Sequence, residues 1–162
     1  MMETMVALAA TGFGLGLSPF MPGTLGSLLG LPLAWLLLTQ RPLRQVLIMA
    51  LLLMVAVALC HWASLWQGSG DAPRIVADEF LVFPVSVLGL ALVNCPWMLV
   101  TAFLLFRMFD ILKLPPINLA ESVGGGLGIV LDDLMAALYT WVLIAIGNAL
   151  WRRFRRKTQE CP

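Results

Sequence analysis

Residues 46–59 read Val-Leu-Ile-Met-Ala-Leu-Leu-Leu-Met-Val-Ala-Val-Ala-Leu, a run without a single polar side chain. The apolar character continues to Trp66, so segment 45–66 reaches the roughly 20 residues that a helix needs to cross a bilayer. Only 12% of the 162 residues are charged, whereas a soluble domain carries about 25%. The chain is therefore predicted to be an all-α integral membrane protein, with one membrane-embedded domain over residues 1–162.

Four further apolar segments cover residues 25–39, 80–93, 97–106 and 134–150. The two middle segments are short for a membrane span, and Asn94–Pro96 between them predicts a hairpin. Together with 45–66, these segments predict about five apolar helices in a multi-pass arrangement. Polar motifs between them are expected to converge at one face of the membrane.

Charge and cysteine usage exclude several classes of protein. The net charge of +1 does not indicate a nucleic-acid partner, and the basic tail at 152–162 is better suited to anionic membrane lipids. Three widely spaced cysteines provide neither a disulfide framework nor a zinc knuckle.

The polar stretch Phe106-Arg107-Met108-Phe109-Asp110-Ile111-Leu112-Lys113 follows a nearly uncharged region. Arg107, Asp110 and Lys113 are three residues apart, which places them within about 120° on one face of a helix. They could form the polar rim of a site that handles a phosphate. Alternatively, Arg107 and Asp110 could form only an interfacial salt bridge.

Two glycine-rich stretches interrupt the apolar segments, at residues 12–27 and 124–128. Glycine allows positive φ and a close approach of the backbone, so such a stretch can bring N–H groups and hydroxyls to an anion. The alternative is a membrane-interface loop whose glycines are merely flexible. The first stretch is not a Walker loop, because no lysine follows its glycines.

Two acidic pairs, Asp78-Glu79 and Asp132-Asp133, hold four of the nine acids, and each is expected to open an apolar helix. One acid would be enough to cap a helix. Two adjacent carboxylates beside lipid repel each other, and a divalent cation relieves that cost most readily. Oxygen ligands without a His or Cys cluster favour Mg²⁺ over Zn²⁺. We expect one member of each pair to bind the metal and the other to support it.

If the site hydrolyses a phosphate ester, the mechanisms that do not use metal-activated water lack the residues they need. No Cys precedes an Arg with the cysteine-phosphatase spacing, there is no Asp-x-Asp motif, and one His cannot supply a His-rich site. Attack of metal-activated water on a phosphomonoester remains.

Five groups of residues occur in a specific order. They are Gly12-Phe13-Gly14; Ser18-Pro19 with Pro22-Gly23-Thr24; Ile75-Val76 with Asp78-Glu79; Phe106-Arg107, Phe109-Asp110-Ile111 and Lys113 with Pro116-Ile117; and Gly125-Gly126, Gly128-Ile129 and Leu131-Asp132-Asp133. In this combination the chain resembles the phosphatidylglycerophosphatase A family over roughly residues 10–150. The resemblance implies a Mg²⁺-dependent enzyme of the bacterial inner membrane that hydrolyses phosphatidylglycerophosphate to phosphatidylglycerol and phosphate.

The resemblance and the residue chemistry together define the expected site. Mg²⁺ is expected at Asp78, Glu79, Asp132 and Asp133. The catalytic residues are expected to be Asp110, Asp132, Asp133, Arg107 and Lys113. The substrate phosphate is expected to contact Ser18, Gly23, Thr24, Arg107 and Lys113. A small transporter or channel subunit that coordinates an ion through its acids is the alternative from another class. An interaction protein whose acids only cap helices is a third.

The orientation in the membrane receives conflicting signals. The positive-inside rule favours the tail at 152–157 in the cytoplasm, whereas the substrate and free Mg²⁺ favour a cytoplasmic site. The tail and the site can both be cytoplasmic only if the last apolar segment, 17 residues long, does not fully cross the membrane. We expect the site to face the cytoplasm.

Overall fold

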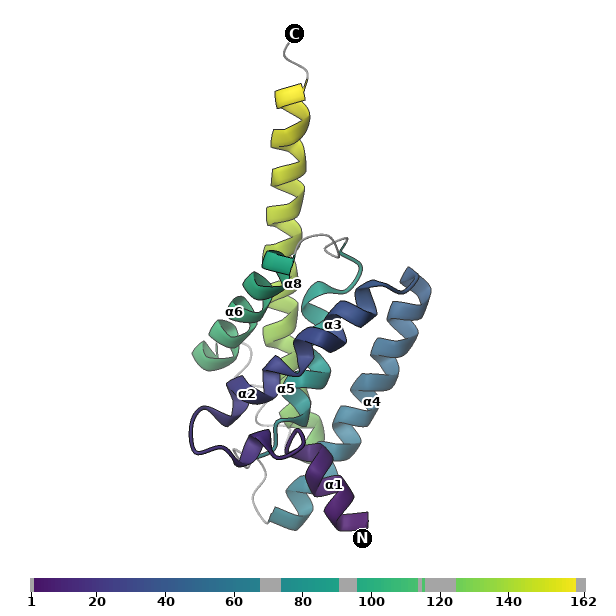
Figure 1. The fold of residues 1–162 in the computed structure, drawn as a ribbon, viewed down its shortest axis with the longest axis vertical. Coiled ribbons are helices and arrows are strands. Elements are labelled where there is room, and N and C mark those ends of the chain that lie inside the picture. The colour runs from purple at the N-terminus through teal and green to yellow at the C-terminus, as the bar shows by residue number, and fades with distance from the viewer. Residues whose placement is uncertain (1, 68–73, 91–95, 114, 116–124, 160–162) are drawn as a thin grey trace.

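The computed structural model describes residues 2–67, 74–90, 96–113, 115 and 125–159. Over these residues the fold is all-α, as predicted, and contains no β-strand (Figure 1). The elements are α1 (Met2–Ala10), η1 (Leu15–Leu17), α2 (Pro22–Leu28), α3 (Gly30–Leu38), α4 (Pro42–Gln67), α5 (Ala77–Val82), η2 (Phe83–Val87), α6 (Pro96–Leu112) and α8 (Gly125–Gln159).

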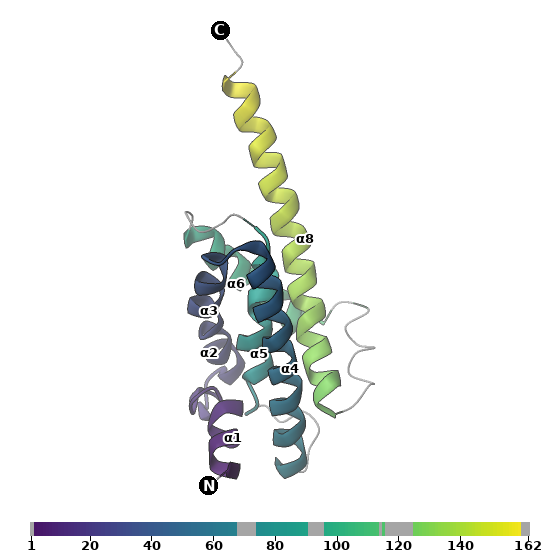
Figure 2. The ribbon, with the colours of Figure 1, turned by 90° about the vertical axis from the view of Figure 1, so that its right-hand side faces the viewer.

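Two long helices, α4 and α8, pack side by side and form the frame of the molecule (Figure 2). Within the described part of the chain, only their segments Pro42–Leu65 and Gly125–Trp151 are long and apolar enough to cross a membrane. The prediction of about five such helices is therefore too high. The physical reason is clearest in the apolar run 80–93, where Pro84 lies at the start of the 3-10 helix η2. Because the described part of the run, residues 80–90, folds into the end of α5, the short η2 and a turn, its side chains contribute to the core rather than to a span.

The core lies where η2 meets α3, α6 and α8. Phe83 is fully buried there and packs edge-on against Phe103 and Phe106, with ring centroids 6.1 and 5.6 Å away. These contacts hold α6 against η2, the segment that continues directly from α5. The ends of α6 and α5 that carry polar residues are thereby brought together.

The second glycine stretch is helical from Gly125 onward, and only Gly124 lies outside the described residues. A Cβ on Gly126 would overlap the backbone of His61 and the carbonyl of Val57 in α4. Close backbone approach here thus serves the packing of α8 on α4. That this stretch also approaches an anion stays a prediction.

The position of Asp132 and Asp133 differs from the expectation as well. Because α8 begins at Gly125, these acids are the eighth and ninth residues of the helix. They lie in its third turn, where the backbone N–H groups are bonded within the helix, so they do not open it. The prediction that this pair stands at a helix N-terminus is wrong, and helix capping does not account for it.

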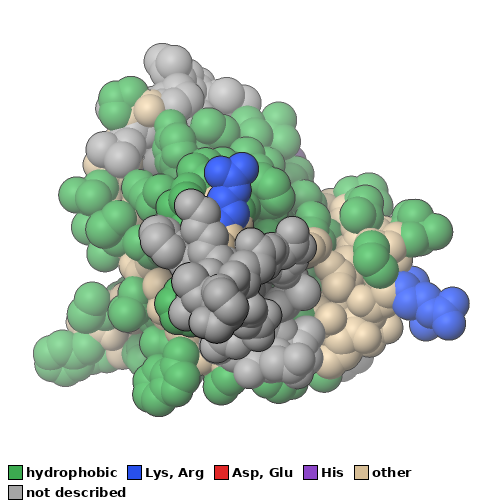
Figure 3. Space-filling model, turned by 90° about the horizontal axis from the view of Figure 1, so that it is seen from above, with side chains coloured by type: hydrophobic (Ala, Val, Ile, Leu, Met, Phe, Trp, Pro, Cys, Tyr) green, Lys and Arg blue, Asp and Glu red, His purple; other side chains and the backbone are tan. Residues whose placement is uncertain are grey.

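The C-terminal part of α8 projects beyond the other helices (Figures 1 and 2). At roughly 1.5 Å per residue its 35 residues extend about 50 Å, so the helix is not limited to the expected 17-residue apolar segment. Seen from this end, the described surface is largely hydrophobic with a few Lys and Arg side chains, and no acidic side chain is in view (Figure 3).

Candidate active site

Four segments converge on one cavity of about 270 Å³. They are the start of α2, the start of α5, the C-terminal end of α6 and the third turn of α8. The lining residues are Met21, Pro22, Gly23, Thr24, Ile75, Asp78, Glu79, Arg107, Asp110, Lys113, Ile129, Asp132 and Asp133. With the exception of Ser18, every residue predicted for the site lines this cavity. Asn94 and Cys95 of the predicted hairpin turn lie outside the described residues. The predicted convergence of the polar motifs is observed, because Arg107 of α6 lies 2.9 Å from Glu79 of α5.

The first turn of α5 is held in place by contacts with the N-terminal segment. Val76, which immediately precedes α5, donates its backbone N–H to the carbonyl of Ala10 at 2.9 Å. The Val76 side chain packs so closely on Gly26 of α2 that a Cβ on Gly26 would overlap it. Asp78 and Glu79 are therefore fixed relative to α2.

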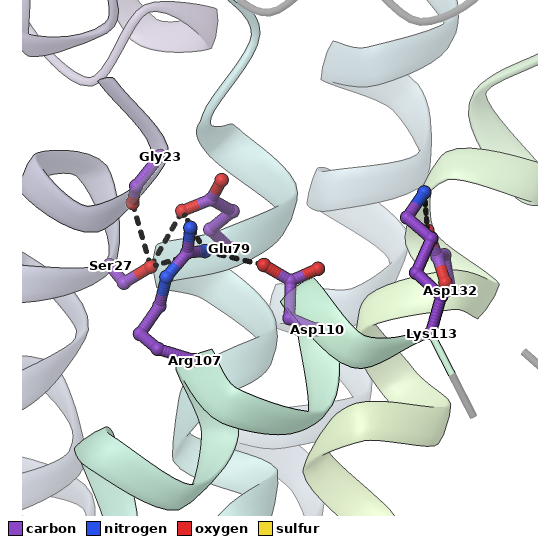
Figure 4. Close-up of polar contacts among 7 residues, drawn as sticks. All are labelled: Gly23, Ser27, Glu79, Arg107, Asp110, Lys113 and Asp132. Carbon is purple, nitrogen blue, oxygen red and sulfur yellow. Dashed lines mark hydrogen bonds and ion pairs between the residues drawn. The ribbon is translucent and has the colours of Figure 1, made fainter. Parts of the chain in front are cut away.

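Arg107 links three elements through a single nitrogen (Figure 4). Its Nη1 lies 2.9 Å from Glu79 Oε2, 2.6 Å from Asp110 Oδ2 and 3.2 Å from Ser27 Oγ. The predicted Arg107–Asp110 salt bridge is confirmed. It is not an isolated surface pair, however, because Arg107 is mostly buried and also holds an acid from α5.

Ser27 was not predicted as a site residue. Its hydroxyl is fully buried and lies 2.6 Å from Glu79 Oε2 and 2.8 Å from the carbonyl of Gly23. A serine within an apolar helical segment is usually a packing residue that bonds its own backbone. Only the placement of α2 against α5 and α6 shows that it also fixes a carboxylate.

Gly23 is required by the same cluster. A Cβ at this position would overlap Glu79 Oε1 and would lie 3.0 Å from Arg107 Nη2. Since φ of Gly23 is not positive, the requirement is steric rather than conformational. The glycine leaves room for the carboxylate and the guanidinium beside the start of α2.

Lys113 and Asp132 form a second ion pair on the other side of the cavity, with Nζ 3.0 Å from Oδ2 (Figure 4). Lys113 follows the end of α6 and has φ 43°, a left-handed conformation that is uncommon outside glycine. Its side chain is the more exposed of the two. This geometry places a cation at the rim of the cavity rather than in its interior.

Asp133 is almost completely buried, and its Oδ2 has no hydrogen-bond partner among the described residues. It lies close enough to Asp78, Glu79, Asp110 and Asp132 for all four to repel its charge. Five carboxylates and two cations line the cavity, an excess of three negative charges when all are ionised. Such an excess favours the binding of a cation.

Burial raises the pKa of Glu79, and repulsion by Asp110 adds to this effect. Arg107 and the Ser27 hydroxyl act in the opposite direction, because both stabilise the carboxylate. The remaining increase indicates that the ion pair does not fully compensate for the loss of water around Glu79.

The donor set suits Mg²⁺ in type, because it consists of carboxylate oxygens. Within the described part of the chain, no three His, Cys, Asp or Glu side chains already form a group that could hold a metal ion. Mg²⁺ typically takes one or two protein carboxylates and completes its shell with water and substrate phosphate. The residues present therefore fit such a site, with the partnerless Oδ2 of Asp133 as one available ligand.

Ser18 lies in the loop before α2, outside the residues that line the cavity. Its Oγ accepts the backbone N–H of Phe20 at 3.2 Å. This contact stabilises the turn between η1 and α2, and the structure does not group Ser18 with the other predicted phosphate-binding residues.

Comparison with known proteins identifies the family. The family model described as Phosphatidylglycerophosphatase A matches residues 8–148. The chain belongs to the phosphatidylglycerophosphatase A family. The match includes every element that lines the cavity, from the loop before α2 to the third turn of α8.

Members of known name support the same assignment. A protein of Escherichia coli K12 named Phosphatidylglycerophosphatase A is 36% identical over 144 residues, which cover 87% of this chain and 83% of the relative. The protein of the same name from Haemophilus influenzae is 38% identical over 148 residues, 90% of each chain. A Bacteroides thetaiotaomicron protein named "Putative phosphatidylinositol-3-phosphatase" is 35% identical over 150 residues, 87% of this chain and 92% of the relative. No solved structure gives a significant match.

Proposed function

We propose that this chain is a phosphatidylglycerophosphatase, which hydrolyses the terminal phosphomonoester of phosphatidylglycerophosphate to phosphatidylglycerol and phosphate. The observation that carries the proposal is the convergence of five of the chain's nine acids with Arg107 and Lys113 on one cavity, in a member of this family. The transporter alternative would leave the family membership unexplained.

The charge of the cavity supports a requirement for Mg²⁺. A phosphate dianion would be repelled by an excess of three negative charges, so the cavity must take up cations before it accepts the substrate. Asp78, Glu79, Asp132 and Asp133 would hold the metal. When bound, Mg²⁺ would neutralise carboxylates, polarise the phosphoryl group and lower the pKa of a bound water.

Other residues of the cavity are suited to bind the substrate phosphate and to position the carboxylates. Lys113 lines the cavity and its side chain is 39% exposed, so its ammonium group is suited to contact the phosphate oxygens as the substrate enters. Arg107 holds Glu79 and Asp110 in register through Nη1, and its Nη2 lies on the side of Gly23. Gly23 and Thr24 line the same part of the cavity, where the phosphate is expected.

Asp110 is suited to accept a proton from the attacking water, because it lines the cavity and is oriented by Arg107. The new bond forms between the water oxygen and phosphorus, and the bond from phosphorus to the glycerol oxygen breaks. The glycerol oxygen leaves with the proton that Asp110 accepted from the water, which yields phosphatidylglycerol and inorganic phosphate and returns Asp110 to its carboxylate form.

We further propose that α4 and α8 cross the bacterial inner membrane and that the cavity faces the cytoplasm, where free Mg²⁺ is plentiful. The length of both candidate spans supports the crossing. Arg41 and Arg44 at the start of α4 and the basic tail at 152–157 lie at the opposite end of the two spans from the cavity, so the positive-inside rule weighs against this orientation. The location of the cavity therefore needs its own test.

Thiol labelling distinguishes the two orientations. In a Cys-free background, Arg74→Cys at the cavity end should resist a membrane-impermeant thiol reagent in intact cells, and Arg41→Cys should react. Both positions are exposed in the structure, so access depends on the side of the membrane. The reverse pattern would place the cavity outside.

Substrate choice tests the function itself. The purified chain in detergent should release phosphate from short-chain phosphatidylglycerophosphate in the presence of Mg²⁺. Short-chain phosphatidylinositol 3-phosphate and phosphatidic acid should be poorer substrates at equal concentration. A chain that prefers phosphatidylinositol 3-phosphate would share the activity in the name of the Bacteroides relative, and the proposed substrate would be wrong.

A further inference from the structure

The loop between α1 and α2 presents large apolar side chains outward. Over residues 12–17, glycine alternates with Phe13, Leu15 and Leu17. Gly12 and Gly16 are buried, whereas Phe13 is 72% exposed and Leu17 is 61% exposed. Phe20 and Met21 follow at 80% and 65%. We name the five side chains of Phe13, Leu15, Leu17, Phe20 and Met21 the apolar lip.

The backbone beneath the apolar lip is tightly fixed. Gly16 donates its N–H to the carbonyl of Thr11 at 2.8 Å, and a Cβ on Gly16 would overlap the carbonyl of Arg74. Ser18 stabilises the turn that leads to Phe20. The outward direction of the apolar side chains is therefore built into the fold.

Two residues of the apolar lip adopt backbone conformations that large side chains rarely take. Phe13 has φ 58° and Met21 has φ 46°, both in the left-handed region. Strain of this kind persists where the surrounding structure enforces it, commonly at ligand-binding sites. Here it keeps bulky apolar side chains at positions where glycine or asparagine would be easier to accommodate.

The apolar lip is continuous with the cavity. Met21 belongs to both, because it lines the cavity and remains largely exposed. Pro22, the next residue, also lines the cavity and begins α2. A substrate whose phosphate lies beside Gly23 would therefore meet an apolar surface as soon as it leaves the polar cavity.

We propose that the apolar lip inserts into the lipid interface and holds the mouth of the cavity against the membrane surface, so that the headgroup phosphate of a diacyl phospholipid in the bilayer can enter the cavity. This inference rests on the proposed function. Irregular backbone is not stable when exposed to the hydrocarbon core, so the loop lies at the level of the headgroups, and its side chains reach the first part of the acyl chains. The exposed Arg74 next to the loop suits the same level, where lipid phosphates are found.

The first test compares two physical forms of the substrate. The double variant Leu17→Ser with Phe20→Ser retains every residue that lines the cavity. It should keep kcat/KM on monomeric short-chain phosphatidylglycerophosphate within about twofold. On long-chain substrate in phosphatidylethanolamine and phosphatidylglycerol vesicles, kcat/KM should fall about tenfold or more, because two large apolar contacts are lost.

The control double variant is Leu43→Ser with Trp97→Ser, which removes equally exposed apolar side chains at the starts of α4 and α6. It should behave as the wild type on both substrates. An equal loss on both substrates in the lip variant, or an equal vesicle-specific loss in the control, would overturn the proposal. Wild-type inactivity on short-chain substrate would instead refute the proposed function.

The second test needs no activity. In a Cys-free background, an environment-sensitive fluorophore on Phe20→Cys should be quenched by vesicle lipids that carry a spin label on the acyl chain near the glycerol. The same fluorophore on Thr4→Cys, an exposed polar position near the start of α1 that adjoins neither candidate span, should be quenched much less. If the Phe20 label escapes quenching and the Leu17→Ser, Phe20→Ser variant turns a dimer into a monomer in detergent, a second copy covers the apolar lip and the proposal fails.

Discussion

Gly23→Ala is the smallest change that should disable the cavity, because it adds one methyl group beside two charged side chains. The new Cβ would overlap Glu79 Oε1 and lie 3.0 Å from both Glu79 Cδ and Arg107 Nη2. Relief requires the Glu79 carboxylate to move, and Ser27 and Arg107 hold that carboxylate through its other oxygen. The carboxylate must therefore rotate away from these partners or shift together with α5.

The expected magnitude follows from this geometry. A displacement of about 1 Å at a catalytic centre costs on the order of 100-fold in rate. Loss of one charge-assisted hydrogen bond between Glu79 and Arg107 or Ser27 would cost about 1.5–3 kcal/mol of stability. We therefore expect kcat on short-chain phosphatidylglycerophosphate to fall about 100-fold, together with a clear decrease in Tm.

Gly147→Ala provides the matched control. Gly147 lies within α8, and a Cβ built on it would have no atom within 4 Å apart from its chain neighbours and the nearby backbone of its own helix. This substitution should leave kcat unchanged and stabilise the helix by about 0.5–1 kcal/mol, because alanine is the better helix former. Wild-type kcat in Gly23→Ala, with an unchanged Tm, would refute the assignment of Glu79 and Arg107 to a rigid catalytic cluster.

Three further predictions follow from the same contacts. Arg107→Lys should lower kcat about 10–100-fold, because an ammonium group cannot keep the geometry of the guanidinium with Glu79 and Asp110. Lys113→Ala should mainly raise KM, and steady-state kinetics of both variants separates the two effects. Gly126→Ala should destabilise the fold by about 1–3 kcal/mol through overlap with the α4 backbone, as measured by thermal unfolding against Gly147→Ala. Asp133→Asn removes a charge that four other acids repel, so its Tm without Mg²⁺ should equal or exceed that of the wild type, and added Mg²⁺ should raise Tm only in the wild type.

The residues that line the cavity were largely predictable from the sequence alone. Acids and cations are rare in this chain, so their presence beside apolar runs is informative. The spacing of Arg107, Asp110 and Lys113 predicted one helix face, and all three line the cavity. The sequence indicated the pair of Arg107 with Asp110, but not that Arg107 also pairs with Glu79 of α5 or that Lys113 pairs with Asp132 of α8.

The features that were not predicted from the sequence depend on packing between helices. Ser27 resembles an ordinary small residue in an apolar helix, and its contact with Glu79 exists only because α2 lies against α5. The glycines at 125–128 resemble a loop, yet they are helical, and Gly126 lets α8 approach α4. The number of membrane spans was overestimated because hydrophobicity alone does not distinguish a core segment such as η2 from a segment that faces lipid.

The most direct test of the account is phosphate release from short-chain phosphatidylglycerophosphate by wild type and Asp133→Asn, measured with Mg²⁺, after chelation and after Mg²⁺ is restored. The account predicts wild-type turnover that a chelator abolishes and Mg²⁺ restores. It predicts that Asp133→Asn stays folded but is slower by orders of magnitude at any Mg²⁺ concentration, because the buried carboxylate is one of the proposed metal ligands. Undiminished wild-type turnover in the chelator, or wild-type turnover in Asp133→Asn, would contradict a metal-dependent phosphatase site in this cavity.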